Sequence, residues 1–154
     1  RAFRREQGLM VSSALLKQTQ DPQSMLDSHF RWVLRQKGSG AQRFLMEVLG
    51  PFGLNTGSLN SELTLFSDRE AAAAIAMNHA DVAPGARATA TEFGLGFISF
   101  GWESFDFALP RTIWFRRLFQ DLVSRLKSEP ALRQAEQLSG YDLTGSGELV
   151  WGED

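Results

Sequence analysis

The sequence predicts a mostly α-helical protein, a compact bundle of about six helices with little or no strand. Three observations support this prediction: apolar residues recur at helical spacing in several segments, helix start signals precede some of these segments, and glycine or proline separates them. The length of 154 residues suits one domain, and 43% hydrophobic with 22% charged residues is typical of a globular protein. We expect a helical bundle over residues 1–127. Residues 128–154 add a short helix and a loop, either within that domain or appended to it.

The N-terminal third contains three expected helices. Apolar residues follow an imperfect helical period between residues 3 and 19. Asp21-Pro22 is a start signal for a second helix, because Asp can cap the first turn and proline fits it. Apolar residues from 25 to 34 then share one helical face, and this helix is expected to end at Gly38-Ser39-Gly40. A short third helix over residues 44–49 ends at a Gly-Pro pair, and residues 51–61 are rich in Gly, Asn and Ser and are expected to form a loop.

The middle of the chain begins with a clear helix signal. Ser67 and Glu70 form a capping box, and four consecutive alanines follow it. We expect this helix to end before Pro84-Gly85 and, because its side chains are small, to lie centrally in the fold. Residues 93–109 fit both an alternating strand and a helical period. We interpret them as a helix over residues 95–108.

Pro110 opens an amphipathic helix over residues 110–127, which carries a net charge of +4. Three apolar residues on it have the 1-5-10 spacing of helices that dock in a hydrophobic groove. With two neighbouring arginines, the candidate partner-binding residues are Trp114, Leu118, Val123, Arg116 and Arg117. The same pattern also suits a helix of the protein's own core or a helix on an anionic membrane surface. A last short helix starts at Pro130 and ends near Leu138.

Composition excludes several classes of function. The chain has no cysteine, which excludes disulfides, thiolate zinc sites and thiol catalysis. A net charge of −2 and a pI near 5.7 argue against a nucleic-acid binder, and no apolar run has the length of a transmembrane span. No nucleophile motif, phosphate loop or dinucleotide fingerprint is present, so we assign no catalytic or cofactor-binding residue. We expect the cytoplasm or an organelle interior rather than an extracellular location. Because the sequence opens on Arg1, we expect a processed product, an excised domain or an incomplete chain.

A few titratable residues stand in apolar surroundings. His29 lies on the apolar side of its expected helix and is interpreted as a core residue, whereas His79 is placed at a helix end. The acidic residues of the apolar segment after residue 91 are Glu92, Glu103 and Asp106. Paired carboxylates in different environments suit glycoside hydrolysis, so a carboxylate-based hydrolase remains an alternative function.

The C-terminal segment places oxygen-bearing residues at regular spacing. They are Asp142, Thr144, Ser146, Glu148 and Glu153. With Gly147 at its sixth position, this segment resembles the calcium loop of the EF-hand family. The resemblance implies a calcium ion held by the side chains of the first three and the last of these residues and by the carbonyl of Glu148. Thr and Ser stand where acidic or amide ligands are usual, and no exit helix follows, so the loop is expected to be either a working or a vestigial site. A simple Gly-Ser turn is the alternative.

Taken together, these patterns predict a non-catalytic helical protein-interaction module or an accessory subunit of a larger assembly, with a calcium-responsive or vestigial loop. Its expected partner is another protein and not a nucleic acid. A peripheral membrane-surface protein that uses helix 110–127 is the first alternative function, and the hydrolase is the second.

Overall fold

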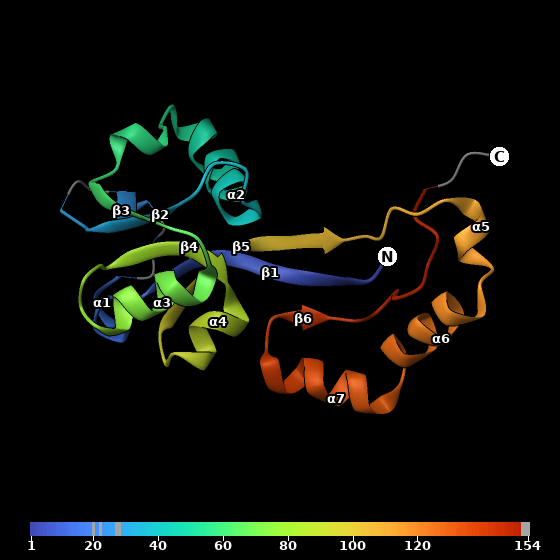
Figure 1. The fold of residues 1–154 in the computed structure, drawn as a ribbon. Helices are drawn as coiled ribbons and strands as arrows, with labels where there is room; N and C mark the ends of the chain where they lie inside the picture. The colour runs from blue at the N-terminus through green and yellow to red at the C-terminus, as the bar shows by residue number, and fades with distance from the viewer. Residues whose placement is uncertain (20, 22, 27–28, 152–154) are drawn as a thin grey trace. The chain divides into compact units, whose positions relative to one another are not determined.

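The computed structural model describes residues 1–19, 21, 23–26 and 29–151, and they form a mixed α/β fold rather than a helical bundle. The strands are β1 (Phe3–Val11), β2 (Trp32–Arg35), β3 (Ser61–Leu65), β4 (Val82–Ala86), β5 (Gly96–Phe105) and β6 (Tyr141–Asp142). The helices are α1 (Ser13–Gln18), α2 (Gly40–Leu49), α3 (Asp68–Ala76), α4 (Arg87–Glu92), α5 (Arg111–Trp114), α6 (Arg117–Leu126) and α7 (Glu129–Leu138). The mostly α prediction is therefore wrong (Figure 1).

The strands join in one sheet with the order β3-β2-β4-β1-β5, and β6 pairs with β1 (Figure 1). β2 is parallel to both β3 and β4, whereas β1 is antiparallel to β4 and to β6. Contacts divide the chain into two compact units. Unit 1 consists of Arg1–Arg5 and Trp102–Asp154, and unit 2 is the continuous stretch Glu6–Gly101.

Unit 2 has a hydrophobic core on each face of its sheet. Alternate residues of a strand point to opposite faces, so Leu9 and Val82 belong to one core while Met10 and Ala83 belong to the other. Residues of α1 and α2 complete the first core, and residues of α3 and α4 complete the second. Figure 1 shows α2 on one side of β4, with α3 and α4 on the other. Helices on both faces are typical of a doubly wound α/β fold.

Close packing explains two features of the sequence in unit 2. The consecutive alanines of α3 are mostly buried in the second core. This confirms that the helix with small side chains lies centrally in the fold. Gly8 is required because a Cβ there would lie 2.0 Å from the carbonyl oxygen of Ile98 on the neighbouring strand. Gly8, which lies within the helix expected over residues 3–19, is therefore a glycine that strand β1 requires.

Several expected helices are strands instead. The segment 3–19 forms β1 and the short α1, because a central strand that is buried on both faces lacks the alternation by which strands are recognised. The segment 25–34 gives a 3₁₀ turn, η1 (Ser24–Leu26), and then β2; Asp21 is described, but Pro22 of the start signal lies outside the described residues. The expected helix 95–108 is β5, and Pro84-Gly85 lies within β4.

Other expectations are confirmed. α2 covers residues 44–49, and 51–61 is mostly loop, with the 3₁₀ turns η2 (Gly50–Phe52) and η3 (Thr56–Ser58). The capping box of α3 is present with both of its hydrogen bonds, and α7 ends at Leu138 as expected. The expectation of one helix over 110–127 is only partly right, because the segment forms two helices, α5 and α6.

Candidate functional site

In unit 2, three parallel strands end at the same edge of the sheet, and a helix begins shortly after each. Residues 36–39 connect β2 to α2, residues 66–67 connect β3 to α3, and α4 follows β4 directly. Because the strands are parallel, the N-termini of the three helices gather at this edge. Helix N-termini carry partial positive charge and unsatisfied amide N–H groups, so the edge is a natural place for a ligand.

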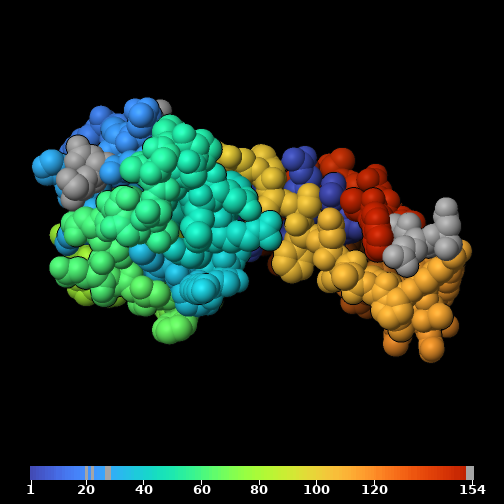
Figure 2. Space-filling view, turned by 90° about the horizontal axis from the view of Figure 1, so that it is seen from above, coloured from blue at the N-terminus to red at the C-terminus, as the bar shows by residue number. Residues whose placement is uncertain are grey.

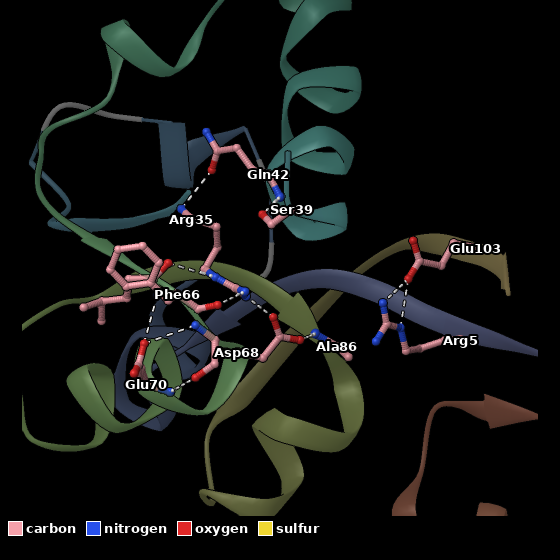
Figure 3. A network of polar contacts seen from close by, with 11 residues as sticks. Arg5, Arg35, Ser39, Gln42, Phe66, Asp68, Glu70, Ala86 and Glu103 are labelled. Carbon is pink, nitrogen blue, oxygen red and sulfur yellow. Dashed lines mark hydrogen bonds and ion pairs between the residues drawn. The ribbon is translucent and has the colours of Figure 1, made fainter. Parts of the chain in front are cut away.

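An ion pair with a buried arginine connects the three strand ends (Figure 3). Arg35, the last residue of β2, is 7% exposed and forms an ion pair with Asp68, the first residue of α3. Its guanidinium also donates to the backbone carbonyls of Leu65, at 3.2 Å, and Phe66, at 3.0 Å. The second carboxylate oxygen of Asp68 accepts the N–H of Ala86 at 3.2 Å. This network fixes the positions of the three strand ends and neutralises both charges.

The N-terminus of α3 is already occupied by acidic side chains of the chain itself. One carboxylate oxygen of Glu70 accepts the N–H of Phe66 at 2.9 Å and the N–H of Ser67 at 3.2 Å. Asp68 and Glu70 both lie in the first turn, where negative charge complements the helix dipole. α3 therefore has little positive potential left for a ligand.

The N-terminus of α2 differs, because its first turn contains no acidic residue. Its cap is neutral: the hydroxyl oxygen of Ser39 accepts the N–H of Gln42 at 3.1 Å (Figure 3). The side-chain oxygen of Gln42 accepts the N–H of Arg35 at 2.9 Å, which joins α2 to the end of β2. The amides of Gly40 and Ala41 precede the helical hydrogen-bond ladder, and Gly40 is exposed.

Space is open in front of α2. A Cβ added at Gly38, whose φ is +89°, or at Gly40 would meet no atom within 4 Å. The side-chain oxygen of Gln36 is buried and has no hydrogen-bond partner among the described residues. Lys37 is exposed in the same connection. The edge therefore offers amide donors, a hydroxyl and a nearby positive charge at a place where a small molecule can enter.

α4 begins with an arginine that is already paired. Arg87 binds both carboxylate oxygens of Glu6, one of them at 3.0 Å, and its guanidinium lies 4.8 Å from the centre of the Phe97 ring. Glu6 is 8% exposed. The hydrogen bond from Arg87 holds the pKa of Glu6 below its ordinary value, and that of Arg87 is raised by the same contact. This pair stabilises the edge. Because acidic side chains occupy the start of α3 and Arg87 at the start of α4 is paired, the N-terminus of α2 is the one that stays open to a ligand.

The predicted calcium loop is held by the start of the chain, within unit 1. Asp142 accepts the N–H of Thr144 at 2.8 Å and lies 3.9 Å from Arg4; hydrogen bonds from Thr144 lower the pKa of Asp142. The Ser146 hydroxyl, 2% exposed, donates to the carbonyl of Ala2 at 2.6 Å.

The remaining predicted ligands are placed as follows. The carbonyl oxygen of Glu148 accepts a hydrogen bond from the α-amino group of Arg1 at 2.7 Å. Glu153 lies outside the described residues. Within the described part of the chain, no three His, Asp or Glu side chains gather as a metal would require. Calcium binding by this loop stays a prediction.

The candidate partner-binding residues are divided between two helices of unit 1 and the connection between them, which contains Arg116. Trp114 ends α5 and packs 5.5 Å from the Phe119 ring centre, whereas Leu118 and Val123 belong to α6. Leu118 is 84% exposed, and Val123 is 8% exposed. Arg116 and Arg117 are both exposed.

The candidate acidic residues each bind an arginine. Glu92 pairs with Arg69 in unit 2, while Glu103 pairs with Arg5 and Asp106 with Arg1 in unit 1. His29 and His79 are both exposed, so the interpretation of His29 as a core residue is wrong.

The sequence interpretation missed the residues of the α2 edge. It treated Gly38-Ser39-Gly40 only as the end of a helix and assigned no role to Arg35 or Asp68. A signal was present: a short apolar run, Trp32 to Leu34, is followed by a Gly-Ser-Gly turn and then by a helical period. A strand, a glycine-rich turn and a helix in this order are a typical anion-binding arrangement.

A doubly wound α/β fold with helix N-termini along one sheet edge defines a class of ligand-binding proteins. The family model described as "PBP superfamily domain" matches residues 1–127, and the chain belongs to this superfamily, whose fold is that of periplasmic binding proteins. The helical interaction module predicted from the sequence is therefore wrong, and we set aside the membrane-surface and hydrolase alternatives with it.

One curated relative matches most of the chain, and two solved structures share its fold. The chain is 27% identical over 147 residues to "Uncharacterized protein YvgK" of Bacillus subtilis (strain 168), covering 95% of the chain and 47% of YvgK. An amino acid ABC transporter substrate-binding protein from Streptococcus pneumoniae, bound to L-arginine, aligns with a TM-score of 0.60 at 12% identity, over 90% of this chain and 58% of that one. The ancestral amino acid-binding protein AncCDT-1 aligns with a TM-score of 0.57 at 12% identity, over 85% and 56%.

Two facts accompany these similarities. The chain spans about half the length of YvgK and somewhat more of the two solved structures. Among the described residues, no helix combines the length and apolar character needed to cross a membrane.

Proposed function

We propose that this protein binds a small solute that carries an anionic group, and that unit 2 holds this group at the N-terminus of α2. The observation that supports the proposal is the difference between the two longer helices that begin at the edge. α3 has two acidic residues in its first turn, whereas α2 has none. An anion at α2 therefore meets helix-dipole attraction without repulsion from the first turn.

The donors at α2 suit a carboxylate or a similar oxyanion. The amides of Gly40 and Ala41 and the hydroxyl of Ser39 supply N–H and O–H donors at one place. Hydrogen bonds to a charged acceptor are about twice as strong as neutral ones, so a few such donors give useful affinity. The Arg35–Asp68 pair holds the end of β2, from which the connection to α2 carries these donors, and less conformational freedom is lost when a ligand binds to a rigid edge.

The similar structures suggest one class of solute. The Streptococcus pneumoniae protein binds L-arginine, and AncCDT-1 is described as amino acid-binding. An amino acid carries the anionic group that α2 would hold. We therefore take amino acids as the first class to test and inorganic oxyanions as the second.

The test is a thermal-unfolding screen of the chain with the L-amino acids, sulfate and phosphate, followed by calorimetry on any compound that raises the midpoint. A ligand that binds only the native state stabilises it by about 2.7 kcal/mol at 100 times its Kd. L-Argininamide is the matched control for L-arginine, because it lacks the carboxylate. Sodium chloride of equal ionic strength controls for general salt effects.

Saturable binding of one of these anions, with no binding of its neutral or amide counterpart, supports the proposal. If no anion in the screen shifts the midpoint beyond the sodium chloride control, the proposal is wrong. Equal binding of L-arginine and L-argininamide would also overturn it, because the carboxylate would then contribute nothing.

A further inference from the structure

Gln36, in the connection that leads into α2, contributes a buried polar atom to the edge that carries the proposed anion site. Its side-chain oxygen is buried and has no hydrogen-bond partner among the described residues. A buried acceptor that is cut off from water and left unpaired destabilises the native state, so native proteins contain few of them. The presence of such an atom beside a ligand site requires an explanation.

A tight turn places Gln36 next to the first turn of α2. The N–H of Ser39 donates to the backbone carbonyl of Gln36 at 3.1 Å. Gly38, with a φ of +89°, has the left-handed conformation that the third position of a type II turn requires. The Cα atoms of the first and fourth residues of such a turn lie within about 7 Å of each other. Gln36 and the Ser39 cap are therefore neighbours.

The side chain of Gln36 is directed to the side of the sheet that α2 covers. Successive strand residues point to opposite faces, and in β2 Trp32 belongs to the core that α1 and α2 complete, whereas Val33 belongs to the other core. Arg35 continues this alternation, because its guanidinium pairs with Asp68 of α3, on the side opposite to α2 (Figure 1). The next residue, Gln36, therefore points to the α2 side.

This place can be reached from solvent. Figure 2 shows the cyan segment that contains α2 at the surface of unit 2. Gly40 is exposed, and a Cβ added to it would meet no atom within 4 Å. Gln36 itself is half-buried, so its side chain lies at the boundary between the interior and solvent. A solute whose anionic group is held by the amides of α2 can therefore place a neighbouring group against Gln36.

The chemistry of the unpaired atom defines that neighbouring group. Carboxylate and sulfate oxygens only accept hydrogen bonds, so they cannot pair with the oxygen of Gln36. An ammonium or hydroxyl group next to the anion can donate to it. A site whose buried polar group needs a partner from the ligand discriminates strongly against analogues that lack this partner.

We propose that Gln36 determines which anions the α2 site accepts, because its side-chain oxygen takes a hydrogen bond from an N–H or O–H group that the solute carries beside its oxyanion. This inference rests on the proposed function and narrows its ligand class. The favoured solutes are α-amino acids, α-hydroxy acids and protonated oxyanions such as hydrogen phosphate. Oxyanions without a donor, such as sulfate, are disfavoured.

The test compares pairs of anions that differ mainly in the donor, by calorimetry on the same chain. The pairs are hydrogen phosphate and sulfate, L-alanine and propionate, and L-arginine and 5-guanidinopentanoate. In any pair that binds, we expect the donor-bearing member to bind at least about tenfold more tightly, because only this member gives the oxygen of Gln36 a partner. The pairs also distinguish an amino acid from an inorganic oxyanion as the source of the donor.

Gln36→Met is the variant to compare with the wild type, since methionine has a similar length but lacks the acceptor. Its preference for the donor-bearing member should fall below about threefold, while its affinity for the other member stays the same. Its Tm without ligand should rise, because an unpaired buried acceptor is removed. The control is Gln18→Met, which should change neither quantity. Gln18 is exposed at the end of α1, at the opposite edge of the sheet, because β1 is antiparallel to β4.

Four results would overturn this inference and leave the proposed function intact. Equal affinity for both members of every pair, or a preference that Gln36→Met retains, would show that the oxygen of Gln36 takes no bond from the solute. An equal loss of sulfate affinity in Gln36→Met would show that Gln36 donates rather than accepts. A lower Tm of Gln36→Met without ligand would show that the oxygen already has a partner. If no anion binds, the proposed function is wrong and this inference is wrong with it.

Discussion

Replacing Gly40 by Asp tests the α2 site most directly, because it should weaken ligand binding and stabilise the fold at the same time. Gly40 is the first residue of α2, is exposed, and leaves room for a side chain. A carboxylate there takes the place that we assign to the anionic group of the ligand. The same carboxylate favours the helix, because negative charge at an N-terminus complements the dipole.

The size of both effects follows from simple electrostatics. Two like charges about 5 Å apart repel by about 0.8 kcal/mol in a water-like medium and by about 3.3 kcal/mol at an effective dielectric constant of about 20. The Kd for an anionic ligand should therefore rise between about 4-fold and about 250-fold. Dipole complementation adds about 0.3 to 1 kcal/mol of stability, and removal of a glycine adds about 0.4 to 1 kcal/mol, together a few degrees in Tm.

The assay combines calorimetry with thermal unfolding of the wild type, Gly40→Asp and Gly40→Asn. Asn has nearly the same shape as Asp but no charge, so it separates electrostatic repulsion from steric exclusion. Loss of affinity in Gly40→Asp, with affinity largely kept in Gly40→Asn and a raised Tm in Gly40→Asp, is the expected pattern. Unchanged affinity in Gly40→Asp would refute the reasoning, since no anion could then lie at the start of α2.

The remaining predictions concern the ion pairs and the calcium loop. Asp68→Asn leaves the guanidinium of Arg35 without its carboxylate, so urea unfolding should show a loss of about 1 to 3 kcal/mol; an effect below about 0.5 kcal/mol would contradict the role of this pair. The pKa of Glu6 is lowered from its ordinary value of 4.5, so its ion pair with Arg87 stabilises the fold above that pH and is lost as the pH falls below it. Urea unfolding at decreasing pH should therefore show a smaller acid loss of stability in Glu6→Gln than in the wild type, and equal losses would exclude this contribution. Calorimetric titration with calcium tests the loop: saturable heat that disappears in Glu153→Gln would establish the site, and no heat in the wild type would exclude it.

The sequence correctly predicted the ends of some helices, because these ends are marked by local residue patterns. Ser67 and Glu70 act through contacts within four residues, and the structure has both hydrogen bonds of their capping box. The start of α7 at Glu129-Pro130 is equally local. Such signals depend only on neighbouring residues, and tertiary packing does not change them.

The strands could not be recognised in the same way, because their identity depends on distant partners. β1 lies between β4 and β5, so its residues from Glu6 to Val11 are all buried and show no alternation of polar and apolar residues. Around β5, Phe93, Leu95 and Phe97 alternate as in a strand, whereas Leu95, Ile98 and Trp102 recur at helical spacing. Only the neighbouring strand selects between the two periods. The α2 edge was missed for the same reason: Arg35 and Asp68 are 33 residues apart, and the pairing of β2 with β3 brings them together.

The arrangement of the two units along the chain has a consequence for the order of folding. Unit 2 is one uninterrupted stretch, Glu6–Gly101, and it contains both hydrophobic cores. During synthesis, all of its contacts are available once residue 101 has emerged. Unit 1 forms later, because residues 1–5 belong with Phe105, Tyr141 and the segment up to Glu148, which the ribosome makes after unit 2. Residues 1–5 are therefore made before unit 2 but reach their final neighbours after it.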